Sequence, residues 1–188
     1  DLWKSIEMIK SIENNFSNTR IRIEYMLGNL CNHKCSYCFP GSNEGDHPWP
    51  DKDLVKKNLG HLLDKYRQNG RTEPVLYLIG GEPTLWKDLP EVCDFFQKEY
   101  NCKIVISTNG AKSRRWWNEN CKYFNEILLS VHHEYANIEH LKKVCDVIYE
   151  NKVFVIANVL MDHRSFEKCK KIVDELQTSL YTWPILSQ

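Results

Sequence analysis

The 188-residue sequence has no apolar run near the ~18 residues that a membrane-spanning helix requires. Its first residues, DLWKSIEMIKSIENNF, mix apolar with charged side chains and lack the continuous apolar stretch of a secretory signal. An excess of one charge sign is also missing, because 25 basic residues balance 25 acidic ones. This balance excludes a global field toward nucleic acid or anionic lipid, although it permits a local basic patch. We therefore expect a cytoplasmic protein without a membrane partner, and nothing in the composition indicates a nucleic-acid partner.

Low-complexity tracts and clear domain linkers are absent as well. Hydrophobic residues make up 42% and charged residues 27%, which is ordinary for a globular protein, and the length fits one domain. We expect residues 1–19 to form an N-terminal helical extension and residues 20–188 to form the core domain. Because the chain starts at Asp1, trimming of outer elements, including elements C-terminal to the core, is an alternative that the sequence leaves open.

Short β-rich runs alternate with amphipathic helical segments from residue 75 onward. The four runs are residues 75–79, 103–107, 126–131 and 153–160. A further strand is predicted over residues 20–28, followed by a helix over 52–69. A sixth strand is predicted near residues 180–186, where Pro184 argues against a central position in a sheet.

The apolar runs are typical of parallel strands that are buried on both faces. Right-handed crossovers wind consecutive βα units into a curved parallel sheet, and a closed eight-unit barrel needs about 200 residues or more. We therefore predict an α/β fold: a partial, open parallel βα barrel of five to six units, resembling a TIM barrel. A doubly wound open sheet is the alternative. Arg22 and Glu24 conflict with burial on both faces, so they either form an ion pair or face a polar lumen.

Three cysteines, Cys31, Cys35 and Cys38, lie directly after the first predicted strand. Disulfides cannot satisfy three cysteines so close together, but a metal site can. A structural zinc site that adds His33 is one interpretation, although such sites usually take two ligand pairs from separated segments, and no second pair stands out. The other interpretation is a four-iron cluster, whose irons normally take one cysteine each, so that three cysteines leave one iron open for another ligand.

The C-x3-C-x2-C spacing, with Tyr37 before the third cysteine, resembles the signature of the radical SAM superfamily. The resemblance extends over roughly residues 20–160. It implies a [4Fe-4S] cluster on Cys31, Cys35 and Cys38 whose open iron binds S-adenosylmethionine (SAM). It also implies that reduction cleaves SAM to methionine and a 5′-deoxyadenosyl radical, which abstracts hydrogen from a substrate C–H bond. The implied partners are SAM, a second substrate, and an electron donor such as flavodoxin or ferredoxin.

A Gly-Gly-Glu-Pro turn follows the predicted strand 75–79 and begins 42 residues after Cys38. An ordinary turn explains such residues, but paired glycines also let the backbone approach a ligand closely, and a carboxylate attracts an ammonium group. The turn resembles the Gly-Gly-Glu motif of the superfamily. The resemblance implies that the amino group of SAM is bound by Gly80, Gly81, Glu82 and Pro83.

Polar side chains also stand at the ends of the next strands, where the loops of a βα barrel converge. Ser107 and Asn109 follow the third strand, and short polar groups there can hydrogen-bond SAM, with a plain turn as the alternative. Ser130 ends the fourth strand and is carried over from the superfamily as a SAM contact. Asn158 lies on the fifth strand, which departs from the glycine-rich pattern common in the superfamily. A structural hydrogen bond and a contact with the adenine or ribose of SAM are equal alternatives for the role of its side chain. Tyr37 is the second adenine candidate.

His132, His133 and Glu134 follow Ser130 and are candidates for substrate binding or proton transfer, because imidazole titrates near neutrality. The sequence leaves the second substrate open. A peptide or protein is favoured over a small molecule, because an open barrel leaves one side free. The polar loop 41–51 is expected to help shield the site. The alternatives to an iron–sulfur oxidoreductase are a zinc-stabilised α/β binding domain without catalysis and a cluster protein that only transfers electrons.

Overall fold

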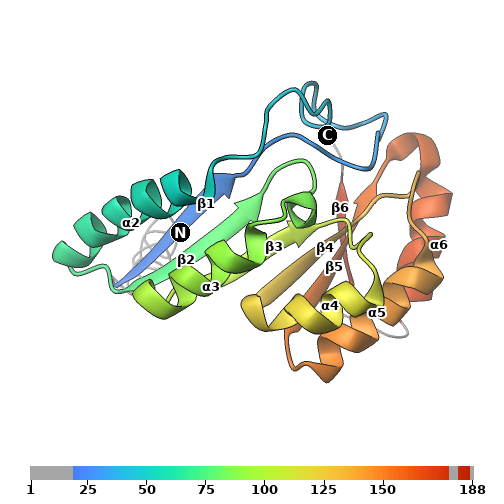
Figure 1. Cartoon of the computed structure of the whole chain (residues 1–188). Helices are drawn as coiled ribbons and strands as arrows, with labels where there is room; N and C mark the ends of the chain where they lie inside the picture. Colours follow the sequence, from blue (N-terminus) through green and yellow to red (C-terminus); the bar gives the residue numbers. More distant parts are fainter. Residues whose placement is uncertain (1–18, 178–181, 187–188) are drawn as a thin grey trace, which may run out of the picture.

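The computed structural model describes residues 19–177 and 182–186, so residues 1–18 of the predicted N-terminal helical extension lie outside the described residues. Six strands form one sheet in the order β1-β2-β3-β4-β5-β6, and every neighbouring pair is parallel (Figure 1). The strands are β1 (Arg20–Met26), β2 (Glu73–Ile79), β3 (Lys103–Thr108), β4 (Glu126–Val131), β5 (Phe154–Met161) and β6 (Thr182–Leu186). Because β1 and β6 occupy opposite edges, the sheet is open, and the predicted partial barrel is confirmed.

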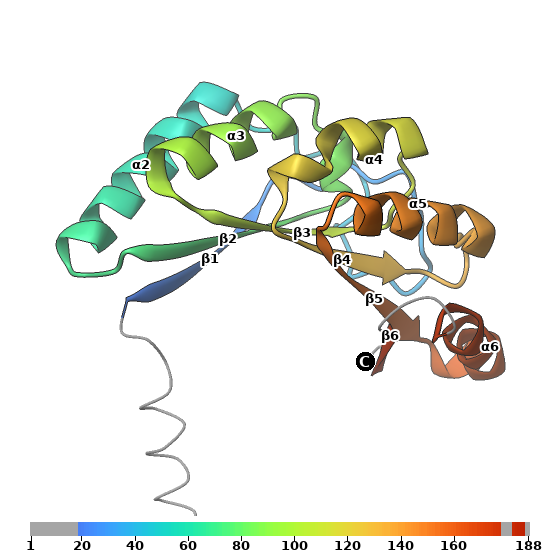
Figure 2. The same ribbon diagram turned by 90° about the horizontal axis from the view of Figure 1, so that it is seen from below.

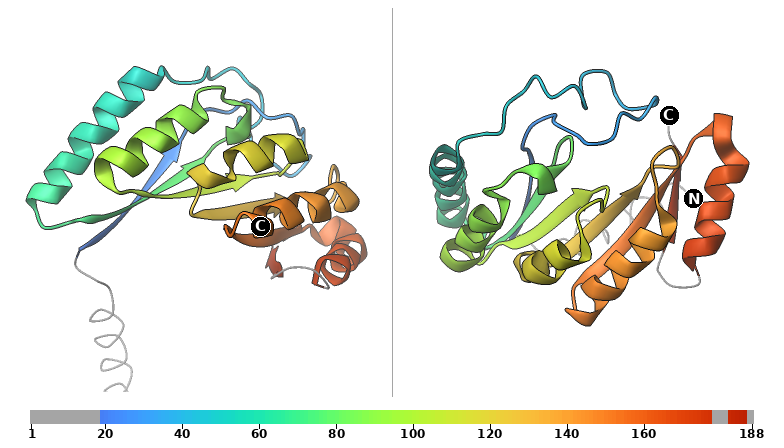
Figure 3. Two further views of the ribbon diagram at one scale, coloured as in Figure 1. Left: turned by 60° about the horizontal axis from the view of Figure 1, so that its bottom comes forward. Right: turned by 45° about the vertical axis from the view of Figure 1, so that its right-hand side comes forward.

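One helix follows each of the first five strands, and short 3₁₀ turns precede or follow some of them. The helices are α2 (Lys52–Gln68), α3 (Leu89–Tyr100), α4 (Arg114–Asn120), α5 (Ile138–Glu150) and α6 (Phe166–Gln177). The 3₁₀ turns are η1 (Pro83–Leu85), η2 (Cys121–Tyr123) and η3 (His163–Ser165). The helices cover the convex side of the curved sheet, and the concave side carries no helix among the described residues (Figures 2 and 3).

The core lies between the sheet and these helices, and the strands mainly bury the face that points toward it; on β3, Val105 of the other face is buried as well. In β4, Ile127, Leu129 and Val131 are buried, whereas Leu128 and Ser130 on the other face are only partly buried. The same alternation runs along β5. Burial of the strands on both faces was therefore a wrong prediction for β2, β4 and β5, whereas the middle of β3 is buried on both faces. Its physical reason is the open barrel, which leaves the concave face without a second packing layer among the described residues.

Arg22 and Glu24 lie on the exposed side of β1 and form an ion pair of 2.6 Å. The Arg22 guanidinium also lies 3.7 Å from the centre of the Tyr77 ring on β2. The pair therefore belongs to a polar concave surface, and both explanations offered for these charges hold. Among the described residues, no helix is long and apolar enough to cross a membrane.

Candidate functional site

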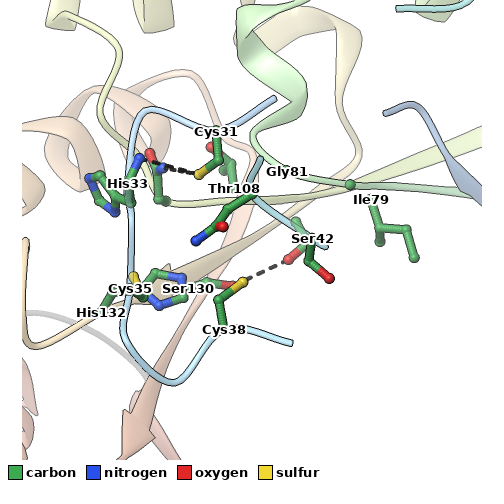
Figure 4. A pocket seen from close by; sticks show the side chains of 14 residues that line it. Cys31, His33, Cys35, Cys38, Ser42, Ile79, Gly81, Thr108, Ser130 and His132 are labelled. Atoms are coloured by element: carbon green, nitrogen blue, oxygen red, sulfur yellow. Dashed lines mark hydrogen bonds between the residues drawn. The ribbon is translucent and has the colours of Figure 1, made fainter. Parts of the chain in front are cut away.

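A cavity of about 190 Å³ lies at the carboxyl ends of the strands (Figure 4). Its lining residues are Cys31, His33, Cys35, Cys38, Ser42, Asn43, Ile79, Gly80, Gly81, Ser107, Thr108, Asn109, Ser130 and His132. The three cysteines, both glycines and the polar ends of β3 and β4 therefore meet in one place, as the sequence predicted. The remaining predicted site residues do not line it: these are Tyr37, Glu82, Pro83, His133, Glu134 and Asn158.

The segment before the first cysteine runs beside the turn that follows β2. The Gly81 amide donates to the Gly28 carbonyl at 2.8 Å, and the Glu82 amide donates to the Leu30 carbonyl at 2.8 Å. A Cβ on Gly81 would stand 2.3 Å from the Leu30 carbonyl oxygen. Real Cβ atoms do not approach a backbone oxygen so closely, so only glycine fits here. This close approach brings the cysteine loop to the cavity, a role for the glycine that sequence reasoning did not separate from ligand binding.

The cysteine side chains point toward the cavity but do not surround a single ion (Figure 4). Within residues 19–177 and 182–186, no group of three or more His, Cys, Asp or Glu side chains is arranged to hold one metal ion. The cavity is also several times larger than one water molecule needs. Three thiols that share a space of this size fit a multi-atom iron–sulfur group better than one zinc ion.

Burial governs the protonation of these thiols. It raises the pKa of the Cys31 thiol, although hydrogen bonds from the His33 amide at 3.3 Å and the Asn109 amide group at 3.8 Å oppose it. Burial raises the pKa of Cys35 to about 11. Without metal, both thiols are therefore protonated at neutral pH. Binding of an iron–sulfur group must release these protons, because a thiolate is the ligand.

Glu82 is almost fully buried and accepts four hydrogen bonds, with exposure of only 1%. Its Oε1 accepts from the Thr84 amide at 3.0 Å, the Thr84 hydroxyl at 2.6 Å and the Thr108 hydroxyl at 2.7 Å. Its Oε2 accepts from the Asn109 amide at 2.7 Å. Among the described residues, no lysine or arginine forms an ion pair with it. The carboxylate thus joins the turn after β2 to the end of β3 and positions Asn109 at the cavity.

The loop after β4 holds the cysteine loop from the other side. The carboxylate of Glu134 accepts from the Ser36 amide at 2.8 Å and from the Ser36 hydroxyl at 2.5 Å. The Tyr135 hydroxyl donates to the Lys34 carbonyl at 3.0 Å, and Arg164 from η3 donates to the Ser36 hydroxyl at 3.1 Å. Ser36, Tyr135 and Arg164 were not predicted, because their pairing depends on contacts between distant parts of the chain.

An aromatic stack fills the space between these loops. The Tyr37 ring stacks on His133 with ring centres 5.1 Å apart and on His132 with centres 6.0 Å apart. Burial, with the neighbouring charges of His33 and His133, lowers the pKa of His132 to about 4, so this imidazole is neutral at pH 7. His133 is buried, and its Nε2 lies 3.7 Å from the carboxylate of Asp162.

Asn29 is a further residue that the sequence analysis missed. It is buried, its side-chain amide donates to the Gly41 carbonyl at 2.7 Å and to the Asp46 carboxylate at 2.5 Å, and its oxygen accepts from the His47 amide at 2.9 Å. These bonds fix the loop 41–51 beside the cysteine loop. In the sequence, the only indication of this role was the position of Asn29, a polar residue between an apolar strand and the first cysteine.

Ser107 and Ser130 lie side by side, with their hydroxyl oxygens 3.2 Å apart. Asn158 faces Ser130 across the register of β4 and β5, on the same side of the sheet. The concave face thus continues from the cavity toward β5, although Asn158 itself does not line the cavity.

The model of the radical SAM superfamily matches residues 25–155, more than half of the chain. Among curated proteins, the chain is 26% identical over 108 residues to GTP 3',8-cyclase of Psychromonas ingrahamii, which covers 57% of this chain and 31% of that protein. It is 24% identical over 173 residues to the radical SAM cyclopropyl synthase TigE of Paramaledivibacter caminithermalis, covering 77% and 36%. The chain thus spans about a third of the length of these relatives.

Among solved structures, native anSMEcpe with bound AdoMet and Kp18Cys peptide superposes with a TM-score of 0.69 at 16% identity, covering 90% of this chain and 52% of that one. This likeness shows the fold, and the family assignment comes from the sequence match. The chain belongs to the radical SAM superfamily.

Proposed function

We propose that this chain is a radical SAM enzyme that holds a [4Fe-4S] cluster on Cys31, Cys35 and Cys38. Members of the superfamily use such a cluster together with SAM. When bound, the cluster supplies the electron that splits SAM into methionine and a 5′-deoxyadenosyl radical, which abstracts hydrogen from a C–H bond of the second substrate. One observation carries the proposal: three thiols share a single cavity with the Gly80–Gly81 backbone and with the polar ends of β3 and β4.

The residues of the chain bind and orient SAM in this proposal. The turn Gly80–Pro83 receives the amino group through its backbone and through the one lone pair that Glu82 Oε2 retains. Ser107, Asn109 and Ser130 hydrogen-bond the polar groups of SAM at the strand ends. Tyr37 and Asn158 contact the adenine or ribose. The neutral imidazole of His132 lines the cavity and can accept a hydrogen bond there.

The cavity must also exclude water and oxygen when it is filled. The loop 41–51 supplies Ser42 and Asn43 to the lining, and the bonds from Asn29 fix that loop in place. A small flavoprotein or iron–sulfur protein, such as flavodoxin or ferredoxin, is the proposed electron donor. We also propose a cytoplasmic location, because a reducing compartment keeps thiolate ligands available. Residues 1–19 are proposed to form an extension to the core of residues 20–188.

Two classes of second substrate have support. The peptide-bound anSMEcpe structure supports a peptide or protein, which the open barrel also favours. The likeness to GTP 3',8-cyclase supports a small molecule. Proposed functions without SAM chemistry have less support, because the thiol arrangement does not fit a single zinc ion in the described part of the chain.

Anaerobic reconstitution followed by reduction in the presence of SAM tests the proposal. The enzyme is expected to be brown, to bind about four irons per chain and to release 5′-deoxyadenosine. Replacing Cys31, Cys35 and Cys38 by alanine should abolish iron binding and cleavage. Cys102→Ala, a buried cysteine outside the cavity, is the matched control and should retain both. A colourless protein with one zinc and no SAM cleavage supports the zinc-stabilised binding domain, and iron without cleavage supports pure electron transfer.

A further inference from the structure

A second cavity of about 880 Å³ lies on the same concave face, at the amino ends of the strands. It is lined by residues of β1 to β5, by Arg71 in the loop before β2 and by Asn125 in the loop before β4. Four of its lining residues are cationic and one is anionic: Arg20, Arg22, Arg71, Lys103 and Glu126. We call the four cationic residues the basic end of the concave face.

The sheet register places these cations close together. Arg22 pairs with Val75, and Val75 pairs with Lys103, so Arg22 and Lys103 share one row across β1, β2 and β3. Two strand spacings separate them, about 9.6 Å. Arg20 precedes Arg22 by two residues on the same face of β1, and Arg71 donates to the Arg20 carbonyl at 3.3 Å, so its guanidinium lies beside the start of this strand. A ligand group only a few ångströms across can therefore contact several of these side chains.

Acidic neighbours neutralise only part of this charge. Glu126 lies in the cavity, and Glu24 forms an ion pair with Arg22. Glu73 lies opposite Arg20 in the register of β1 and β2, on the same face, and is a third carboxylate. Four cations minus these three carboxylates leave an excess of one positive charge. Among residues 19–177 and 182–186, no acidic side chain forms an ion pair with Arg20 or Lys103. The whole chain has zero net charge, so the excess is local.

The face changes character between the basic end and the cysteine cavity. Partly buried apolar residues, including Leu128 and Ile156, form the middle of the face. Ser107 and Ser130 form its end at the cysteine cavity. Lys103 and Ser107 are four residues apart on β3, which corresponds to about 13 Å along the strand. A ligand that is anionic at one end and carbon-rich along its length can match this order.

We propose that the basic end binds the diphosphate group of the second substrate, which is a phosphorylated small molecule. The inference rests on the proposed function and narrows its substrate class. Guanidinium groups bind phosphate oxygens in a bidentate manner, and three of the four cations are arginines. Three guanidinium groups and one ammonium group offer more hydrogen-bond donors than a single carboxylate can accept, which favours a diphosphate. With the diphosphate at the basic end, the carbon part extends along the apolar middle toward the cysteine cavity.

Calorimetric titration of the full chain with inorganic pyrophosphate at about 0.15 M salt tests this site. Wild type should show saturable one-site binding with a Kd below about 1 mM. The double variant Arg20→Gln/Lys103→Gln should weaken that binding at least tenfold. Neither side chain has an ion pair among the described residues, so the fold should tolerate the change. Circular dichroism before each titration verifies that the variant is folded.

The control Lys57→Gln/Lys143→Gln removes the same charge from two exposed lysines on α2 and α5. It should change the Kd less than twofold; an equal loss in both double variants would refute a local site. Absence of saturable pyrophosphate binding to wild type overturns the proposal, as does tighter binding of an N-acetylated tetraglutamate peptide. Because the titration needs neither cluster nor SAM, its failure is distinguishable from a failure of SAM cleavage.

Discussion

Replacing Glu82 by glutamine tests whether this buried carboxylate mainly positions the site. Glutamine has nearly the same shape, but it exchanges one acceptor oxygen for an NH₂ donor. If the NH₂ group takes the place of Oε2, it faces the Asn109 amide, donor against donor. In the other orientation it faces the Thr84 amide, with the same result. In either case one buried backbone N–H loses its acceptor.

The size of the effect follows from the bonds involved. An unpaired buried N–H costs about 1–3 kcal/mol, and each of the three remaining bonds loses about 1 kcal/mol when its acceptor is no longer charged. These contributions sum to about 4–6 kcal/mol. Relief of the buried charge offsets part of them, because removing a carboxylate from water is itself unfavourable. We therefore expect Glu82→Gln to lower the free energy of unfolding by about 2–4 kcal/mol.

Urea unfolding of the full chain under anaerobic conditions, followed by tryptophan fluorescence, measures this loss. Glu119→Gln is the matched control, because Glu119 forms only an exposed ion pair with Arg115, which contributes at most about 0.5 kcal/mol. If Glu82→Gln unfolds at the same urea concentration as wild type but loses affinity for SAM, the positioning role is wrong. The carboxylate would then act chiefly as a ligand of the SAM amino group.

Three further predictions concern the loops and the helices. Gly81→Ala places a Cβ against the backbone before the first cysteine and should lower the free energy of unfolding, measured in urea, by more than about 3 kcal/mol. Gly41→Ala, with open space around it, should lower it by about 1–2 kcal/mol through its positive φ alone. Glu134→Ala removes the acceptor of two Ser36 bonds and should at least halve the iron retained after gel filtration; full retention would contradict a role in holding the loop. Hydrogen bonds from two lysines of α2 lower the pKa of Glu91 to about 2 from its usual 4.5, so its contribution to stability exists above about pH 4.5 and is lost as the pH falls toward 2. Wild type should thus lose more stability than Glu91→Gln between about pH 5 and pH 2.5 in urea titrations, and parallel losses would refute the pairing.

Much of the fold could be predicted from the sequence, because each strand is an apolar run between amphipathic segments. All six strand boundaries lie within two residues of the prediction. Pro184 lies in the edge strand β6, where a missing amide is tolerated. The bounds of the short helix α4 could not be predicted, because it has seven residues and buries only Trp117, too few for a clear periodicity.

Burial of the strands could not be read correctly from hydrophobicity. Leu128 and Ile156 resemble the core residues beside them, yet they point to the concave side of an open barrel and are only partly buried. Whether a strand has one or two packed faces depends on barrel closure, which is a property of the whole chain. The charges at Arg22 and Glu24 were the one sequence feature that indicated an open face.

The site was predictable where one short motif contains the information, as in the spacing of Cys31, Cys35 and Cys38. Their convergence with the Gly80–Gly81 turn followed from the parallel order of the strands. The supporting bonds were not predictable. Ser36 and Glu134 are 98 residues apart, and no local pattern links them. All of the assigned SAM contacts, including those of Tyr37 and Asn158, remain predictions.

Formation of 5′-deoxyadenosine by the anaerobically reconstituted protein, with dithionite as reductant, tests the central claim most directly. We predict that the wild-type chain forms it together with an equal amount of methionine and that the triple alanine variant at Cys31, Cys35 and Cys38 forms none. Equal yields from the two proteins would contradict the account, because SAM would then be cleaved without the three thiols.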